Sequence, residues 1–256
     1  MILRFLGTHN AESRNTRLVS FLIDGVLAVE AGSLVSELTF LEQTKIKAIL
    51  LSHGHYDHIR AIPAFAFNNS DRNTKVFATS PTLQILSSHL LDGVVYPKFT
   101  SEASFLGKAT LQLIPMEPFN RQNIEGYEVT AIPVRHPLHA VGFEIISMDG
   151  SRIFYTGDTG PALSDVWENV SPQLIIADVT WSNRLGSAAE AAGHLCPELL
   201  KRELIEFRRI KGYLPDILII HMSPQYELEI GKEVGEVAKE LEVSITIAPE
   251  GKELVL

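Results

Sequence analysis

The segment LLSHGHYDHI, residues 50–59, places three histidines and an aspartate within six positions, directly after an apolar run. Neutral imidazole and carboxylate are ligands for zinc, iron and manganese. Because alternate side chains of an extended segment share a face, His53 and His55 could hold one ion. Asp57 and His58, beyond the turn, could hold a second. Chance would produce the H-x-H-x-D-H pattern only about 0.0004 times in a chain of this composition and length, so the pattern indicates a metal site.

Three further residues of ligand type follow apolar runs later in the chain: His136, Asp158 and His221. Each is weak evidence alone, since a single histidine at a strand end is more often structural. Loops that leave one edge of a rigid sheet can converge on one point, however, and sites are usually built there. Together with the first cluster these residues would supply two ions, and the two oxygens of Asp158 suit it to bridge them.

The elements that must position these residues form a mixture of short strands and helices. A hairpin is expected over residues 18–32, with its turn at Asp24-Gly25. Apolar runs predict further strands at residues 46–52, 127–134, 142–157, 173–179 and 216–221. Helical patterns cover residues 34–43, 81–91, 186–210 and 226–242, and the third must break near Gly193 to Pro197. Two sheets covered by helices, an αββα sandwich, is one layered solution, although periodicity alone does not select it.

The composition limits the class of protein. With 256 residues, 45% hydrophobic and 21% charged, the chain can form one sizeable core, so we expect a single domain over residues 1–256. A net charge of −9 disfavours large nucleic acids, and the basic cluster at residues 201–211 is interpreted as a solvated helix face. The single cysteine, Cys196, fits a reducing compartment. We recognise no signal peptide or apolar span, and therefore expect a cytoplasmic protein without a membrane partner.

Four segments resemble successive motifs of the metallo-β-lactamase superfamily: HGHYDH, VRHPLHAVGF, YTGDTG and IIHMSP. More narrowly, the chain resembles the class II cyclic nucleotide phosphodiesterases. That resemblance is carried by SFLIDGVLAVEAGSL, HLLDGVVYPKFT, GDTGPALSDVWENV and, above all, GHLCPELLKREL. It covers nearly the whole chain. It implies an α/β fold, the αββα four-layer sandwich of the metallo-β-lactamases, with a binuclear metal site.

The resemblance also implies a role for each candidate residue. One ion would be held by three histidines: His53, His55 and His136. The other would be held by Asp57, His58 and His221. Asp158 would bridge the two ions. His194 would lie near the scissile phosphate as a catalytic and substrate-binding residue, Asp57 is assigned to catalysis as well as to metal binding, and His139 is a second candidate for substrate contact.

The implied reaction is hydrolysis of a 3′,5′-cyclic nucleotide, such as cyclic AMP, to a nucleoside 5′-monophosphate. Two divalent transition-metal ions would hold a bridging hydroxide that attacks phosphorus, with zinc the first choice and manganese or iron as alternatives. Phosphoryl transfer demands positioning and electrostatic stabilisation, which such a site supplies. His194 would stabilise the developing charge or protonate the leaving group. The expected partner is a small nucleotide, and a homodimer is left open.

Several features keep other functions open. Glu30 stands where the family usually has aspartate, and Ser223 where it usually has lysine. HMSPQY and HPLHAVGF lean towards ribonuclease Z, so an RNA-processing phosphodiesterase with the same ligands is the first alternative. The net charge and the lack of a long basic, glycine-rich arm weigh against it. A metal-binding module without turnover is the second alternative, although such a module needs neither seven ligands nor His194. A diiron electron-transfer protein would normally carry a flavin domain.

Two residues stay without an assigned role in the sequence. His9, in the segment LGTHNAE, lies in a loop where the superfamily approaches its metals, although a surface-loop position is somewhat preferred. Asp178 ends a predicted strand and could orient a metal ligand through a hydrogen bond.

Overall fold

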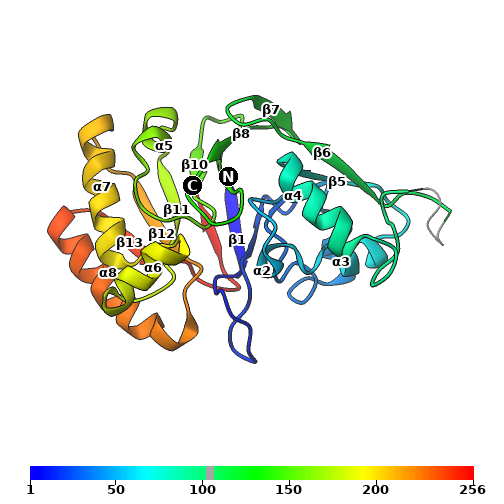
Figure 1. Cartoon of the computed structure of the whole chain (residues 1–256). Helices are drawn as coiled ribbons and strands as arrows, with labels where there is room; N and C mark the ends of the chain where they lie inside the picture. Colours follow the sequence, from blue (N-terminus) through cyan, green and yellow to red (C-terminus); the bar gives the residue numbers. More distant parts are fainter. Residues whose placement is uncertain (102–106) are drawn as a thin grey trace. The chain divides into compact units, whose positions relative to one another are not determined.

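The structure is a computed structural model that describes residues 1–101 and 107–256 (Figure 1). The chain divides into two compact units. The first comprises Met1–Gly7, Arg17–Glu117 and Pro249–Leu256, and the second comprises Thr8–Thr16 and Pro118–Ala248. Within the described residues each unit holds one seven-stranded sheet and its own helices. Whether the chain behaves as the single domain expected from its length stays a prediction.

The sheet of the first unit has the strand order β14-β1-β2-β3-β4-β5-β6. Its strands are β1 (Ile2–Gly7), β2 (Ser20–Ile23), β3 (Leu27–Val29), β4 (Ala48–Leu50), β5 (Thr74–Ala78), β6 (Leu111–Pro115) and β14 (Glu253–Val255). Pairing is antiparallel from β14 to β3 and parallel from β3 to β6. The predicted hairpin is confirmed. Three residues, 24–26, connect β2 and β3, and Asp24 and Gly25 have the positive φ expected at the centre of a tight turn, which the Val26 N–H closes by donating to the carbonyl oxygen of Ile23.

Short helices complete the first unit: α1 (Phe40–Gln43), α2 (Tyr56–Ile59), α3 (Ile62–Asn68), α4 (Ser80–Ile85) and the π-helical turn η1 (Leu86–Leu90). The helix predicted at residues 34–43 is shorter than expected, because Thr39 caps α1 in a capping box with Glu42. Pro81 lies in the first turn of α4, as predicted. Apolar side chains of these helices, such as Phe65 and Leu86, are fully buried in one core with the sheet.

The sheet of the second unit has the order β13-β12-β11-β10-β9-β8-β7. Its strands are β7 (Arg121–Ile124), β8 (Tyr127–Pro133), β9 (Val141–Ile146), β10 (Arg152–Tyr155), β11 (Leu174–Asp178), β12 (Asp216–Ile220) and β13 (Ile245–Ile247). Strands β7 to β10 pair antiparallel, and β10 to β13 pair parallel. The carboxyl ends of β10, β11 and β12 therefore lie at one edge of the sheet.

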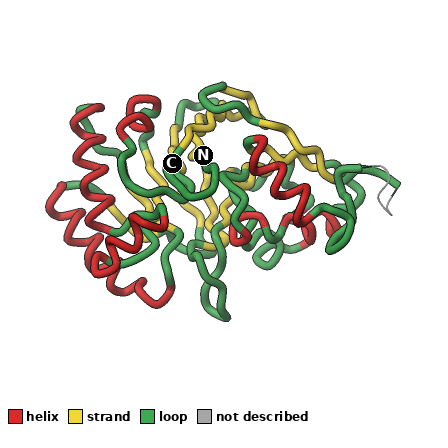
Figure 2. The backbone as a smooth tube through the Cα atoms, in the orientation of Figure 1, coloured by secondary structure: helices red, strands yellow, loops and turns green. Residues whose placement is uncertain are grey.

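The helices of the second unit gather beside these parallel strands (Figures 1 and 2). They are α5 (Ser164–Asn169), α6 (Gly186–Ala192), α7 (Pro197–Lys211), α8 (Glu227–Leu241) and the 3-10 turns η2 (Asn183–Leu185) and η3 (Pro224–Tyr226). The break expected inside residues 186–210 is confirmed, since Gly193 ends α6 with a φ of 75° and Pro197 begins α7. No helix within the described parts of the chain has both the length and the apolar character needed to cross a membrane.

Candidate metal centre

In the first unit the HGHYDH motif lies on the turn that leads from β4 into α2. His53 is fully buried, and its Nε2 lies 3.0 Å from Nδ1 of His55. Two nitrogens that bind one zinc at about 2.0–2.1 Å must lie within about 4.2 Å of each other, so this pair fits a single ion. The ring of His58 is 4.2 Å from that of His53, and its Nε2 is 3.6 Å from Oδ2 of Asp57. All four predicted ligands of the motif are thus together.

Buried polar groups orient these histidines. The hydroxyl of Ser52 contacts Nδ1 of His53 at 2.9 Å. Glu30 is fully buried; its Oε1 accepts the backbone N–H of Ser52 at 3.1 Å, and its Oε2 lies 3.4 Å from Nδ1 of His58. A carboxylate on the far nitrogen of a ligating histidine fixes the ring and raises its basicity. Glu30, noted in the sequence only as a departure from aspartate, is therefore placed to position His58.

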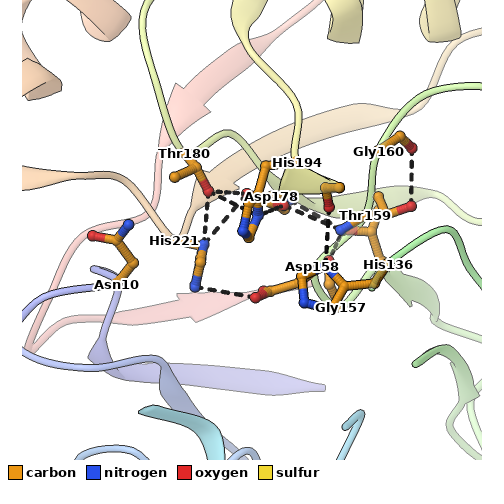
Figure 3. A network of polar contacts seen from close by, with 12 residues as sticks. Asn10, His136, Gly157, Asp158, Thr159, Gly160, Asp178, Thr180, His194 and His221 are labelled. Atoms are coloured by element: carbon orange, nitrogen blue, oxygen red, sulfur yellow. Dashed lines mark hydrogen bonds and ion pairs between the residues drawn. The ribbon is translucent and has the colours of Figure 1, made fainter. Parts of the chain in front are cut away.

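In the second unit, side chains from adjacent strand ends form another cluster (Figure 3). Asp158, Asp178, His194 and His221 each offer one ligand atom, and these atoms lie within 4.8 Å of one another. Nε2 of His221 is 3.3 Å from Oδ2 of Asp158. The ring of His136 is 5.1 Å from that of His194. The predicted convergence of β10, β11 and β12 accounts for the cluster, because Asp158 and His221 follow two of these strands and Asp178 ends the third.

Hydrogen bonds indicate which nitrogen of each histidine can bind an ion. Nδ1 of His136 lies 3.0 Å from the carbonyl oxygen of Gly193, which can only accept, so Nδ1 carries the proton. Thr180 Oγ1 donates to Oδ1 of Asp178 at 2.7 Å and therefore accepts from Nδ1 of His221 at 2.8 Å. Nε2 of both rings then carries the lone pair that a metal ligand needs. Burial also lowers the pKa of His136, which favours the neutral ring.

Asp178 orients His194 through a hydrogen bond of 2.8 Å between its Oδ2 and Nδ1 of the ring. Burial acts to lower the pKa of His194, but the charge of Asp178 and this bond outweigh it, so the pKa is raised. Burial acts to raise the pKa of Asp178, while its interactions with His194 and His221 lower it. The other oxygen, Oδ1, lies 3.4 Å from Nδ1 of His221. Asp178 therefore positions two histidines, the role that the sequence left open.

Two hydroxyl residues that orient histidines were not predicted: Thr180, which contacts His221, and Ser52, which contacts His53. A hydroxyl residue beside a strand end is common. The only signal in the sequence is that Thr180 lies two residues after Asp178 and that Ser52 directly precedes His53. His139 is exposed in the loop between β8 and β9, and its contact with substrate stays a prediction.

A cavity of about 360 Å³ opens in the second unit beside His136. This volume lies at the lower end of the roughly 300–1,000 Å³ that small-molecule sites occupy. Its walls include Arg135, Glu190 and residues 160–162. Nε of Arg135 donates to the carbonyl oxygen of Ala162 at 2.8 Å, which fixes the guanidinium against the wall. A cation is therefore held next to a candidate metal ligand.

The sequence model of a protein family, the beta-lactamase superfamily domain, matches residues 20–245 of the chain. The chain therefore belongs to this family. The predicted metallo-β-lactamase fold, with two mixed sheets flanked by helices, is confirmed. The chain is accordingly a member of a metallo-hydrolase family, and it carries clusters of histidine and aspartate of metal-binding type.

Relatives and solved structures agree with the predicted resemblance. A probable 3′,5′-cyclic-nucleotide phosphodiesterase of Yersinia pestis is 22% identical over 210 residues, which are 73% of this chain and 60% of the relative. A ribonuclease Z of Methanocaldococcus jannaschii is 27% identical over 154 residues, 56% of this chain and 46% of the relative. The alignments thus span less than two thirds of either relative. The crystal structure of unliganded yeast PDE1 matches with a TM-score of 0.85, at 15% identity over 100% of this chain and 99% of that one.

Proposed function

We propose that this protein is a metal-dependent phosphodiesterase that hydrolyses a 3′,5′-cyclic nucleotide to a nucleoside 5′-monophosphate. The observation that carries the proposal is His194, a histidine of raised pKa held by Asp178 beside the ligand atoms of Asp158 and His221. A module that only binds metal has no use for such a proton donor. The relatives named as cyclic-nucleotide phosphodiesterases support the choice of substrate.

The donor atoms fit divalent transition-metal ions. They are imidazole nitrogens and carboxylate oxygens, the set that suits zinc, iron and manganese. Nε2 of His53 lies 3.0 Å from Nδ1 of His55, which is close enough for both nitrogens to bind one ion. Nε2 of His221, which carries a lone pair, lies 3.3 Å from Oδ2 of Asp158, so these two atoms could also bind one ion. Following the family pattern, we assign one ion to three histidines: His53, His55 and His136. We assign the other to His58, His221 and Asp57, with Asp158 as the bridge.

Two such ions, when bound, lower the pKa of a water molecule and polarise the phosphoryl oxygens. The protein itself supplies the proton for the leaving group. Nδ1 of His194 is engaged by Asp178 and Thr180, so Nε2 is the atom that can donate. In the metal-free protein the charge and hydrogen bond of Asp178 raise the pKa of His194, which favours the protonated ring that a general acid requires. Bond cleavage at the 3′ oxygen would transfer this proton, and solvent would restore it.

The cavity beside His136 is suited to the part of the nucleotide that does not react. Arg135 can bind an acceptor or anionic group there, because its guanidinium is held by the carbonyl oxygen of Ala162. Its size suits a small ligand better than a polynucleotide.

The basic cluster on α7 does not favour an RNA substrate. Its cations pair with acidic side chains of the same unit: Lys201 with Glu240, Arg202 with Glu198, and Arg209 with Glu206. Non-specific binding of a tRNA depends on many Lys and Arg contacts with phosphates, and a net charge of −9 opposes it. The ribonuclease Z alternative keeps its support from the relative of that name and from the segment HMSPQY.

The proposal is tested by kcat/KM, with saturating zinc or manganese, on cyclic AMP, cyclic GMP, a linear chromogenic phosphodiester and a tRNA precursor. We expect a cyclic nucleotide to be turned over faster than the tRNA precursor. Efficient cleavage near the 3′ end of the tRNA precursor, with negligible activity on both cyclic nucleotides, would favour ribonuclease Z activity. Absence of turnover on all four substrates, with metal bound, would favour the metal-binding module.

A further inference from the structure

His221 has an unusual backbone for a metal-ligand candidate. Its φ is 63°, in the left-handed region that side chains with a Cβ rarely adopt, and the residue is buried. Such a conformation persists only where the surrounding structure enforces it. The direction of the imidazole, and with it the position of Nε2, depends on whatever holds residues 220–223 in place.

One restraint on this segment comes from the end of β11. The backbone N–H of Val179 donates to the carbonyl oxygen of Ile220 at 3.0 Å, and that of Ser223 donates to the carbonyl oxygen of Thr180 at 2.9 Å. These bonds hold the residues on either side of His221. They follow from the parallel pairing of β11 with β12 and would be expected from the sheet alone.

A second restraint comes from Thr8–Asn10, more than two hundred residues earlier in the chain. The backbone N–H of Met222 donates to the carbonyl oxygen of Thr8 at 3.1 Å. In return, the backbone N–H of Asn10 donates to the carbonyl oxygen of Met222 at 3.2 Å. The side-chain amide of Asn10 then donates to Oγ of Ser223 at 3.0 Å. Figure 3 labels Asn10 and His221 in the same close view, and Asn10 contacts the two residues that follow His221.

The Asn10–Ser223 bond joins two side chains, because the hydroxyl oxygen of Ser223 accepts from the amide N–H of Asn10. Next to Asn10, the buried His9 contributes a contact of 3.3 Å between its Nε2 and Oε2 of Glu227, which ties the same segment to the start of α8.

We propose that Asn10, through its bond to Ser223, is a positioning residue that holds His221 in its left-handed, metal-binding orientation. It acts on His221 through the backbone of residues 221–223 and needs no contact with substrate. This inference rests on the proposed function in one respect, namely that His221 binds a metal ion.

The test is cobalt(II) binding to the metal-free protein, followed by the visible absorption of the bound ion and by competition with a chelator. The variant His221→Ala identifies the cobalt equivalent that depends on His221. Asn10→Ala is expected to weaken that equivalent about 10–100-fold, the usual effect of losing a group that orients a ligand, and to leave the other unchanged. Asn15→Ala, an exposed asparagine of the same loop, is the matched control and should bind cobalt as the wild type does.

A second variant separates positioning from general structural support. Ser223→Ala removes the same bond from the other end, so it should weaken the same equivalent, and the double variant should be no weaker than either single one. Equal cobalt affinity in Asn10→Ala and the wild type overturns the inference alone. The inference is also overturned if both variants lose both cobalt equivalents and are unfolded in the metal-free state, since that result marks a structural role. A wild-type protein that binds no cobalt overturns the proposed function as well.

Discussion

His194 and Asp178 gain their chemical properties from each other. The carboxylate raises the pKa of the histidine against the effect of burial, and the histidine lowers the pKa of the buried carboxyl group. The type and position of both residues could be read from the sequence, but this pairing could not. It depends on the fold bringing the end of β11 next to the segment between α6 and α7, and on Thr180, whose hydroxyl also bonds to His221.

His194→Ala tests the assignment of this residue as a general acid. The variant should keep its metal content, because His194 lies outside both proposed ligand sets. We expect kcat to fall about 10²–10⁴-fold, the usual loss on removal of a proton-transfer partner. Full activity would make His194 structural, whereas loss of metal measured by elemental analysis would make it a ligand.

Asp178→Asn tests the origin of the raised pKa. In the metal-free protein the change removes the charge that raises the pKa of His194 and leaves the effect of burial, so this pKa should fall. NMR titration of the ring would measure it. The sign for stability follows: a raised histidine pKa stabilises the fold fully below the unfolded-state pKa of about 6.5, and this contribution is lost as pH rises through the folded-state value. An unchanged pKa in the variant would contradict the pairing.

At the scale of elements, the break between α6 and α7 positions the site. Gly193 has a φ of 75°, and its carbonyl oxygen accepts the bond from Nδ1 of His136. A Cβ at this position would lie 2.6 Å from Cδ of Pro137 and 3.2 Å from Nδ1 of His136. Glycine therefore serves both the backbone turn and the close approach of the loop that carries His136.

Gly193→Ala should lower the free energy of unfolding and weaken metal binding. The matched control is Gly212→Ala, because Gly212 has a φ of 79° and no atom within 4 Å of an added Cβ. The control should cost about 1–2 kcal/mol, the strain of a left-handed residue with a side chain. Gly193→Ala should cost about 1–3 kcal/mol more through overpacking. Equal losses in denaturant unfolding, with metal affinity unchanged, would show that the contact with His136 has no consequence.

The sequence predicted the elements that carry the site better than it predicted the rest of the fold. The buried strands β4, β11 and β12 are recognisable because they are short, continuous apolar runs. Strands β1, β5, β6, β7, β13 and β14 were not predicted, and β7 and β14, at sheet edges, are largely polar or exposed. The run expected at residues 142–157 is two strands, β9 and β10, with a turn between them. The ligands could be found because they follow apolar runs, while Glu30, Ser52 and Thr180 could not, since only tertiary contacts reveal what they orient.

For the whole molecule, the charge distribution determines the class of substrate that we expect. A net charge of −9 and the pairing of the basic residues on α7 leave little attraction for a polyanion. A cyclic nucleotide carries one negative charge and makes few ionic contacts. The cytoplasmic location and the homodimer considered from the sequence stay predictions.

The dependence of kcat/KM on salt tests this interpretation. A cyclic nucleotide carries one charge and no condensed counterions, so raising salt from about 50 to 200 mM should change its kcat/KM little. A tRNA bound through six to ten phosphates would lose about 10³–10⁵ in affinity. A change at Arg135 tests the cavity beside His136 in the same assay. Arg135→Ala should raise KM more than it lowers kcat, because the cavity is proposed to hold the part of the nucleotide that does not react. A steep salt dependence for the cyclic nucleotide would contradict the small-ligand account.

The most direct test of a binuclear phosphodiesterase is a titration of the metal-free protein with manganese or zinc, in which cyclic nucleotide hydrolysis is measured at each addition. We predict that activity rises with metal, saturates at two ions per chain and produces the nucleoside 5′-monophosphate. Asp158→Ala should require far more metal, since it would weaken both sites. Saturation at one ion per chain, or no hydrolysis at any metal concentration, would contradict the account.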